Sequence, residues 1–308
     1  MNLSKEIEIY IRMRQQLGFK LRSIKYVLRG FGTYIKEKKA SHITTKLALE
    51  YAMRNPHCSL FQQSVKLGII RRFAHYLRTI DPQTEVPPEH LLACSYQRPS
   101  PYIYIASEIS KIQAALLNLP SKCPMERHAH YTLFGLLAAT GMRISEALSL
   151  RCDGVDLKHG LITIRESKFR KSRKIPIHAS VKRALKRYAL YRDKHCVAKA
   201  SSFFFVTGRG NECRADSFRK AFATALVLAG LRWEQDHMPR IMDLRHTFAV
   251  RALARCHKER RDATAMLVAL SRYLGHESPA NTYWYFSATP ELLRYINNRV
   301  EGTFGGDL

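Results

Sequence analysis

The sequence predicts a mainly α-helical protein with a small antiparallel β-sheet, in which a helical N-terminal domain precedes a mixed α+β domain. Apolar residues recur at helical spacing throughout residues 1–80, as expected when one face of each helix is buried. Residues 81–101 hold five prolines and lack helical periodicity, which is typical of an interdomain linker. Two short runs, 161–164 and 174–177, favour strands on either side of a basic turn. We therefore expect domains over 1–80 and 102–308.

The composition is that of a globular protein with a polyanionic partner. The 308 residues include 51 Lys and Arg against 25 Asp and Glu, a net charge of +26, and 46% of them are hydrophobic. This excess favours nucleic acid as the partner; the alternative is a charged surface that keeps the protein in solution. The seven cysteines form no C-x-x-C pair or zinc-like block, so we interpret them as reduced thiols of a cytoplasmic protein. No apolar run approaches the roughly 20 residues that span a bilayer, and the N-terminus lacks a signal-peptide core.

The N-terminal domain is expected to contain four helices. Gly18 interrupts the first, Thr45 is a candidate cap for the third, and the fourth runs from about Ser59 to Ile80. Their inward residues are Ile7, Ile11 and Met13, then Ile24, Val27, Leu28, Phe31 and Ile35, then Leu47, Leu49 and Met53, and finally Leu67, Ile70, Phe73 and Leu77. The other faces of the second and fourth helices carry Lys20, Arg22, Lys25 and Arg29, and Lys66, Arg71, Arg72 and Arg78. A charged helix face is often only solvated, but with this net charge we favour contact with the DNA backbone.

The second domain is expected to combine helices with one hairpin. A helix capped by Ser107 ends before Pro120, and a very apolar helix over 128–139 stops at Gly141, just before Arg143 starts the next one. A basic helix is expected over 180–194, followed by a buried run at 203–206, a loop at Gly208 and Gly210, and a helix from Asp216 to Gly230. Asp243 is expected to cap the next helix, which turns Leu244, Phe248 and Leu253 inward. Gly275 ends a helix over Leu267, Leu270 and Leu274, and a last helix runs from Pro290 to about Val300.

Four stretches of this domain carry an ordered set of polar groups. They read TGMRISEAL at 140–148, ESKFRKSRKIPI at 166–177, MDLRHTFAV at 242–250 and LGHESPANTYWYF at 274–286. Together they closely resemble the tyrosine recombinases, also called the phage integrase family. In that family two arginines, a histidine and a tyrosine nine residues later converge on one DNA phosphate. One such stretch would be a weak signal, whereas four in order are a strong one.

The resemblance assigns the central chemistry. Tyr285 would attack the scissile phosphorus and form a 3′-phosphotyrosine, which keeps the bond energy for rejoining. Its rival Tyr283 breaks the nine-residue spacing from His276, which would hydrogen-bond the phosphate. Arg143 and Arg245 would hold the extra negative charge of the transition state through charge-assisted forks. The resemblance implies no cofactor and no metal, and the sequence offers no carboxylate cluster for Mg²⁺.

The hairpin and the first arginine motif would supply supporting groups. Lys168 aligns with the family's general acid for the leaving 5′-oxygen, with Lys171 and Lys174 as competitors. Glu146 lies one turn after Arg143, where it either buttresses the site as in the family or serves only as an intrahelical partner of arginine. The residues expected to contact DNA outside the catalytic set are Lys25, Arg29, Lys66, Arg71, Arg72, Arg170, Lys171 and Arg173.

One position departs from the family pattern. The family places His or Lys three residues before the second arginine, and this sequence has Met242 there. A thioether cannot relay a proton, so Tyr285 would lose its proton more slowly, to water or to His237, or the protein is impaired. The interval from the second arginine to the histidine is also longer than in compact members, with 256–263 as the expected insertion.

Two classes of function are consistent with these features. The leading hypothesis is a recombinase of a bacterial or phage mobile element, which acts on double-stranded DNA with paired recognition sites. The resemblance implies a tetramer whose C-terminal helix, near 290–300, docks on a neighbour, with or without other recombinases. The alternative is a non-catalytic DNA-binding homologue with an architectural role, for which Met242 is the best support. A type IB topoisomerase shares the chemistry, but the helical N-terminal half and the short LGH motif favour a recombinase.

Overall fold

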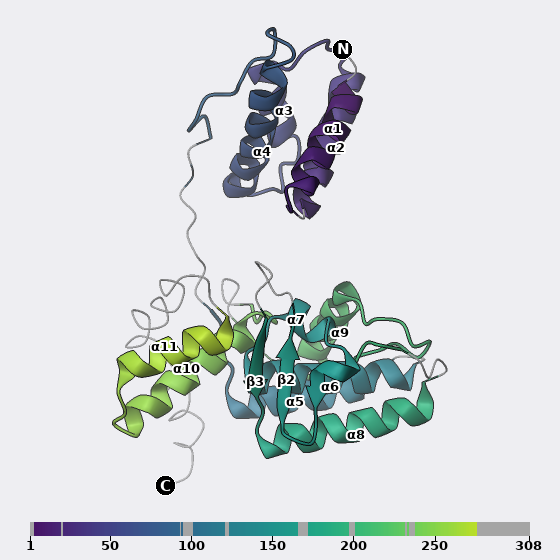
Figure 1. Ribbon diagram of the computed structural model, residues 1–308, viewed down its shortest axis with the longest axis vertical. Coiled ribbons are helices and arrows are strands. Elements are labelled where there is room, and N and C mark those ends of the chain that lie inside the picture. Colours follow the sequence, from purple (N-terminus) through teal and green to yellow (C-terminus); the bar gives the residue numbers. More distant parts are fainter. Residues whose placement is uncertain are drawn as a thin grey trace. The chain divides into compact units, whose positions relative to one another are not determined.

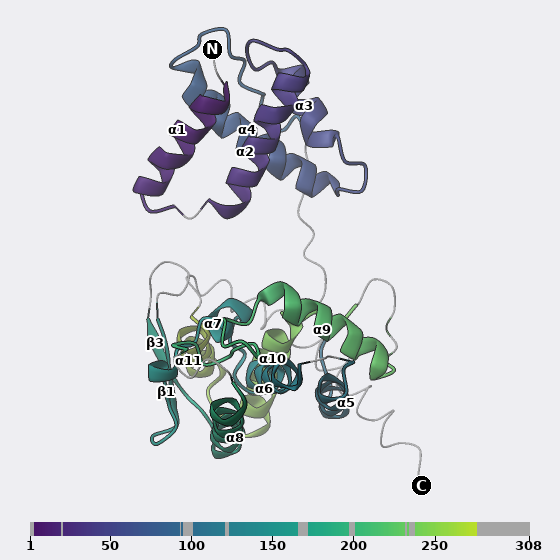
Figure 2. The ribbon, with the colours of Figure 1, turned by 90° about the vertical axis from the view of Figure 1, so that its right-hand side faces the viewer.

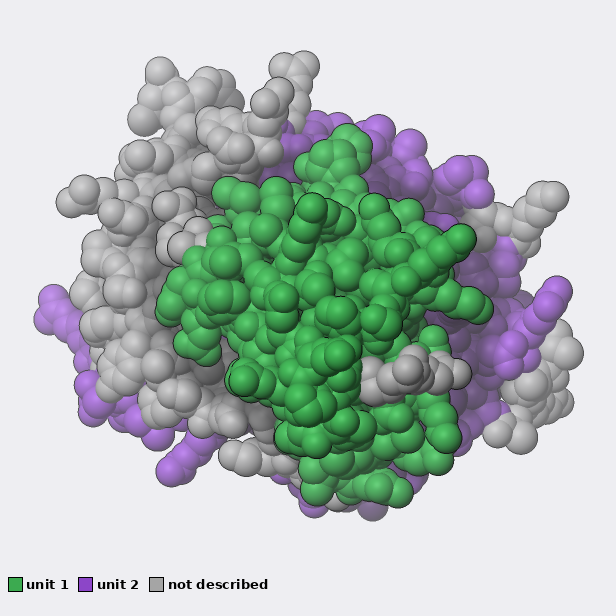
Figure 3. All heavy atoms as spheres, turned by 90° about the horizontal axis from the view of Figure 1, so that it is seen from above, with its two compact units in different colours: residues 1–98 green, residues 99–308 purple. Residues whose placement is uncertain are grey.

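The computed structural model describes residues 3–19, 21–92, 94, 101–120, 123–165, 172–196, 201–231, 233 and 238–275. The chain forms two compact units, residues 1–98 and 99–308, which are coloured separately in Figure 3. Both units are built mainly of helices, and the second contains a small antiparallel sheet. The predicted fold class is therefore confirmed.

The N-terminal unit is a helical bundle (Figures 1 and 2). Its described helices are α1 (Leu3–Gln16), α2 (Arg22–Glu37), α3 (Thr45–Met53) and α4 (Leu60–Arg78). One apolar cluster joins all four, and it includes the fully buried Phe31 and Phe73. The helical spacing of apolar residues thus corresponds to a shared core.

Two details of this unit differ from the expectation. Thr44, not Thr45, caps α3, because the Thr44 hydroxyl accepts the Leu47 N–H at 3.2 Å. Met13 and Met53 were expected to face inward but are 36% and 47% exposed. A helix turns about 100° per residue, so a residue two positions after a buried one, as Met13 is after Ile11, lies toward the opposite face.

The beginning of the predicted linker packs on the N-terminal unit. The Glu85 N–H donates to the Ile43 carbonyl at 2.9 Å. The Arg71 guanidinium donates to the carbonyls of Pro87 and Pro88 at 2.8 and 2.7 Å. These bonds fix the chain as far as Pro88, so the expected linker begins later than residue 81.

In the second unit a short sheet lies at one edge of a group of helices (Figures 1 and 2). Its described elements are α5 (Ala106–Leu117), α6 (Pro124–Thr140), α7 (Ile144–Leu148), a 3-10 turn (Cys152–Gly154), β1 (Val155–Asp156), β2 (Leu161–Ile164), β3 (Arg173–Pro176), α8 (Ala179–His195), α9 (Ala215–Leu228), α10 (Asp243–Lys258) and α11 (Ala263–Leu274). The sheet order is β1-β2-β3, and Ile164 lies opposite Arg173. Among the described residues, no helix combines the length and apolarity needed to cross a membrane.

Several element boundaries differ from the predicted ones. Ser107 does not cap α5; the Glu108 carboxylate reaches back and accepts the Ile105 N–H at 2.9 Å. Helix α6 begins at Pro124, before the predicted residue 128, because proline suits the first turn of a helix. Strand β3 begins at Arg173, one residue earlier than predicted. Such ends depend on local hydrogen bonds that hydrophobic periodicity does not encode.

The start of α10 is fixed by a buried carboxylate and its partly exposed arginine partner. Asp243 is 0% exposed, and its carboxylate accepts the backbone N–H of Arg240 at 2.9 Å and the Arg240 guanidinium at 2.8 Å. The expected cap therefore acts on the turn that precedes the helix. Leu244 and Leu253 are buried as predicted, and Phe248 is partly buried against α11.

Candidate active site

Two helix ends and the first turn of a third helix meet at one point of the second unit. Gly141 ends α6 with φ 61° and Gly275 ends α11 with φ 68°, a left-handed conformation that glycine adopts without strain. A Cβ atom on Gly141 would lie 2.7 Å from Phe248 of α10 and 3.2 Å from Leu274 of α11. The glycines of the TGMR and LGH sequences thus allow these elements to approach closely.

Arg245 projects from the first turn of α10 into this meeting point. The residue is only 7% exposed. One terminal nitrogen donates to the Gly141 carbonyl at 2.9 Å, and the other donates to the Leu274 carbonyl at 2.8 Å. These carbonyl partners compensate the burial of the charge and fix the plane of the guanidinium.

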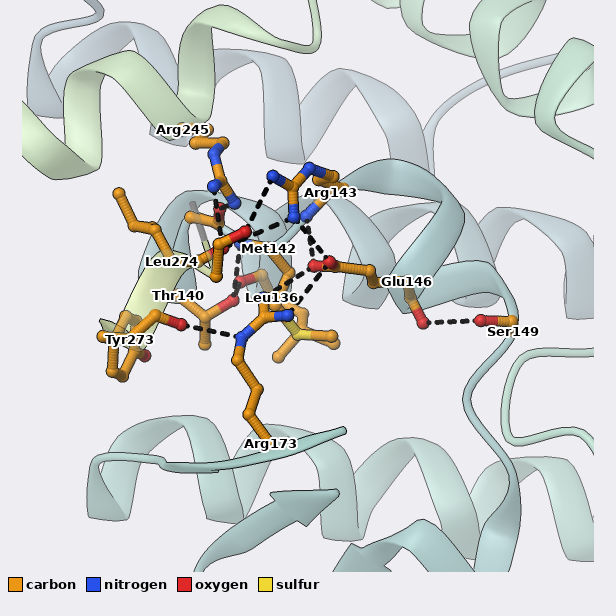
Figure 4. A network of polar contacts seen from close by, with 12 residues as sticks. Leu136, Thr140, Met142, Arg143, Glu146, Ser149, Arg173, Arg245, Tyr273 and Leu274 are labelled. Atoms are coloured by element: carbon orange, nitrogen blue, oxygen red, sulfur yellow. Dashed lines mark hydrogen bonds and ion pairs between the residues drawn. The ribbon is translucent and has the colours of Figure 1, made fainter. Parts of the chain in front are cut away.

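Arg143 approaches the same helix end from α7. It is the N-cap of α7, with φ −70° and ψ 143°, and its side chain is 30% exposed. One terminal nitrogen donates to Glu146 Oε1 at 2.8 Å, and the other donates to the Gly275 carbonyl at 3.1 Å (Figure 4). The first nitrogen also lies 3.5 Å from the Leu274 carbonyl, so the two predicted phosphate-binding arginines are brought together.

Glu146 links the first arginine to the hairpin. Its carboxylate accepts the backbone N–H and a side-chain nitrogen of Arg143 at 3.0 and 2.8 Å, and two nitrogens of Arg173 at 3.1 and 2.8 Å. Burial would by itself raise the pKa of Glu146, but the hydrogen bonds and charge of Arg173, followed by the bonds from Arg143, hold the pKa below its ordinary value. Glu146 is thus an ionised bridge, and its interpretation as only an intrahelical partner is wrong.

Arg173 is bound within the unit, in contrast to its expected exposure to DNA. It was expected to contact the DNA backbone, but its side chain is only 14% exposed and its guanidinium is bound within the unit. Its Nε donates to the Tyr273 carbonyl at 2.8 Å (Figure 4). The signal that was missed is strand alternation: Arg173 lies on the same face of β3 as Ile175, which is 1% exposed.

Three guanidinium groups therefore surround one helix end. Arg143, Arg173 and Arg245 donate to the consecutive carbonyls of residues 273–275, where the helix dipole carries partial negative charge. Among the described residues of this network, the three arginines and the Glu146 carboxylate sum to a formal charge of +2. Planar arginine forks around such a point are suited to binding phosphate oxygens.

Met242 lies at the edge of the site. Its side chain is 68% exposed, and its carbonyl accepts the Arg245 N–H at 3.1 Å in the turn that enters α10. The side chain therefore does not pack in the core of the unit. A different side chain at this position would not disturb the core.

Several of the expected DNA-binding residues have partners within the N-terminal unit. Arg29 on α2 is paired with Glu8 of α1 at 2.7 Å, although the Arg29 side chain is 57% exposed. The Lys66 ammonium on α4 lies 3.2 Å from Cys58 Sγ. Contact with DNA by these residues stays a prediction, as it does for Lys25, Arg71 and Arg72.

The remaining predicted site residues lie outside the described part of the chain. They are Lys168, Arg170, Lys171, His237, His276, Tyr283 and Tyr285, together with the helix expected near 290–300. The described site thus comprises Arg143, Glu146, Arg173 and Arg245, and it ends one residue before His276.

The fold and the arginine site define a class of protein that acts on DNA strands. The sequence profile of the phage integrase family matches residues 106–291, and the chain belongs to this family, the tyrosine recombinases. It is 37% identical over 300 residues to the integrase/recombinase-type protein y4rB of Sinorhizobium fredii, which covers 96% of both chains. It is 27% identical to the tyrosine recombinase XerC of Syntrophus aciditrophicus, over 76% of this chain and 72% of that protein.

Solved structures share the fold at lower sequence identity. The site-specific recombinase XerH, bound to its difH substrate before cleavage, has a TM-score of 0.63 at 20% identity, over 92% of this chain and 81% of that chain. The Tn1549 transposon integrase, in complex with a circular intermediate DNA, has a TM-score of 0.66 at 17% identity, over 96% of this chain and 99% of that chain. At these identities the likeness concerns the fold.

Proposed function

We propose that this protein is a site-specific DNA recombinase that cuts and rejoins strands through a 3′-phosphotyrosine on Tyr285. The observation that supports this most strongly is the convergence of Arg143 and Arg245 on the Leu274 carbonyl, at 3.5 and 2.8 Å. The two arginines come from positions about 100 residues apart in the chain. Both face the turn that leads directly to His276.

The arginines would act by stabilising charge. Attack of a tyrosine oxygen on a phosphodiester gives a transition state with extra negative charge on the non-bridging oxygens, and fixed guanidinium groups offset it without reorganisation. Glu146 keeps Arg143 oriented because it is ionised and buried. The arginine donors already bind the helix-end carbonyls, so a phosphate would share or replace these contacts.

Proton transfer would fall to groups assigned by the family motif. Lys168 would protonate the leaving 5′-oxygen, and His276 would donate a hydrogen bond to the phosphate. A tyrosine with an ordinary pKa of about 10 must lose its proton during attack, and with Met242 in place of a basic residue this proton would leave to water or to His237.

The proposed partner is double-stranded DNA with paired recognition sites, bound by a homotetramer. Support comes from the net charge of +26 and from the DNA complexes of XerH and of the Tn1549 transposon integrase. We propose integration, excision or transposition of a mobile element as the process. The resemblance also implies that the N-terminal helical unit clamps the DNA duplex.

The proposal is tested by trapping the covalent adduct. A nicked suicide duplex, built from inverted repeats that flank the gene, is incubated with the protein, and the DNA-linked peptide is mapped. We expect an adduct on Tyr285 that is lost in Tyr285→Phe and kept in the matched control Tyr283→Phe. Arg245→Lys retains the charge but loses the fork, and removing one preorganised donor typically slows such chemistry by about 10²–10³. An adduct on Tyr283 would overturn the assignment.

A second candidate function is an architectural DNA-binding homologue without strand cleavage. Met242 favours it, because the residue at this position cannot move a proton. In this case the native protein would bind the same duplex but form no adduct under any condition in which an active relative does.

A further inference from the structure

Arg173 is the arginine of this site to which the proposed recombination chemistry gives no role. We propose that Arg173 is a positioning residue: it takes the paired contact of the Glu146 carboxylate, so that Glu146 holds Arg143 in place without neutralising it. This inference rests on the proposed function, in which Arg143 binds the scissile phosphate.

The two arginines bind Glu146 unequally. Arg173 donates one terminal nitrogen to each carboxylate oxygen, at 3.1 and 2.8 Å, which is the bidentate arrangement that makes arginine–carboxylate pairs strong. Arg143 gives the carboxylate one side-chain nitrogen at 2.8 Å and its backbone N–H at 3.0 Å. The carboxylate charge is therefore matched mainly by Arg173, and the second terminal nitrogen of Arg143 points toward the Gly275 carbonyl instead.

Arg173 also fixes the position of three elements relative to one another. It belongs to β3, binds Glu146 of α7, and donates its Nε to the Tyr273 carbonyl of α11 at 2.8 Å. Its guanidinium lies against Gly275, where an added Cβ would be 2.7 Å from Nη1 and 2.9 Å from Cζ. All three nitrogens of one plane are used, so a lysine could supply the charge but not the geometry.

Loss of Arg173 would change the ionisation of Glu146. The carboxylate is 5% exposed, and a buried carboxylate without adequate partners has a raised pKa. The contacts from Arg173 are the largest of those that hold this pKa down. With only Arg143 left, Glu146 would take up a proton at a higher pH, and the protonated form would no longer orient the phosphate-binding arginine.

If Arg173 only stabilised the fold, its loss would change the cleavage rate equally at all pH values, whereas loss of a positioning residue for Glu146 should change the pH dependence of the rate. Single-turnover cleavage is measured across pH for the native protein, Arg173→Met, Arg173→Lys and the double variant Arg173→Met/Glu146→Gln. We expect Arg173→Met to lower the rate roughly tenfold or more, by less than the about 10²–10³ of a direct donor, with duplex affinity nearly unchanged. The variant should gain a new acidic limb, in which the rate falls as pH drops through the raised Glu146 pKa. The double variant should lose this limb, because glutamine does not titrate.

Two controls make the result specific. Arg165, the residue that follows β2, forms an exposed pair with Asp153 at 2.8 Å, so Arg165→Met should show neither the rate loss nor the acidic limb. Arg173→Lys, which is closest to native in charge, should show a smaller rate loss than Arg173→Met. The proposal would be overturned if the cleavage rate of Arg173→Met had the same pH dependence as that of the native protein and if its lower rate were explained by a smaller folded fraction.

The DNA-free protein provides a test that does not depend on cleavage. In the native protein the Glu146 pKa lies below 4.5, so its stabilising contribution is present above that pH and is lost as pH falls through the lowered value. In Arg173→Met the Glu146 pKa lies higher than in the native protein, so less stabilisation is gained as pH rises. The difference in Tm between the two proteins should therefore widen with rising pH. A difference in Tm that stays constant with pH would refute the role of Arg173. Failure of the native protein to cleave DNA would refute the proposed function, and the Tm test would still be valid in that case.

Discussion

Replacing Gly275 with alanine should destabilise the protein by more than the backbone strain alone, because the new methyl group would also displace Arg173. Gly275 has φ 68°, and a left-handed conformation costs an L-residue about 1–2 kcal/mol. About 0.4–1 kcal/mol of this is offset because alanine restricts the unfolded chain. The new Cβ would also lie 2.7 Å from Arg173 Nη1, inside the about 3.5–4.0 Å of an ordinary contact. Arg173 would have to retreat by roughly an ångström, which breaks its 2.8 Å bond to Glu146.

Gly230 provides a matched control. It follows α9 with φ 62°, and an added Cβ there would meet nothing within 4 Å. Gly230→Ala should therefore cost at most about 1.6 kcal/mol of strain, whereas Gly275→Ala should cost about 1–3 kcal/mol more from overpacking. Urea unfolding measures both values, and single-turnover cleavage should fall for Gly275→Ala alone. Equal stability losses, or native cleavage by Gly275→Ala, would refute the placement of Arg173 against this glycine.

Three further predictions follow from the described residues. Met242→His should speed strand cleavage, since general acid–base assistance typically raises a rate about 10²–10⁴-fold. The Tm should be unchanged because position 242 is 68% exposed. An unchanged cleavage rate at equal Tm would exclude a proton-transfer role for this position. Burial lowers the pKa of His130 from 6.5 to about 4, so the stability of the protein should fall as pH drops through this interval. In a plot of Tm against pH, His130→Gln should therefore show a smaller slope over this interval than the native protein. Removing residues 1–95 should leave a fragment with a cooperative thermal transition, because its core clusters lie within residues 99–308; a fragment that fails to fold would indicate a core shared by the two units.

The fold was largely predictable because burial has a local signature. Leu267, Leu270 and Leu274 lie on one face of α11, as their spacing requires, and Gly275 ends the helix. Predictions failed where a distant or backbone partner decides the outcome. Ile105, the residue before α5, donates its N–H to Glu108, and hydrophobic periodicity carries no information about that bond.

The candidate site was predictable in its residues but not in its contacts. Arg143, Glu146 and Arg245 stand in recognisable motifs, and the structure brings them to one helix end. Arg173 stood in the hairpin motif among several basic residues, and only its alternation with Ile175 distinguished it from the solvent-facing ones. Its partners lie 27 and 100 residues away in the chain, beyond the reach of any local pattern.

The sequence by itself determined which segments become helices and where glycine must end them, because both follow from the periodicity and conformational freedom of neighbouring residues. It also determined the charge that suits a polyanion. Only the tertiary structure decided how the charges of the site are shared. Arg173 and Arg143 compete for one buried carboxylate, and Arg245 takes the carbonyls of two helix ends. How these arginines share their partners depends on distances between α7, β3, α10 and α11, and these are fixed only when the elements pack together.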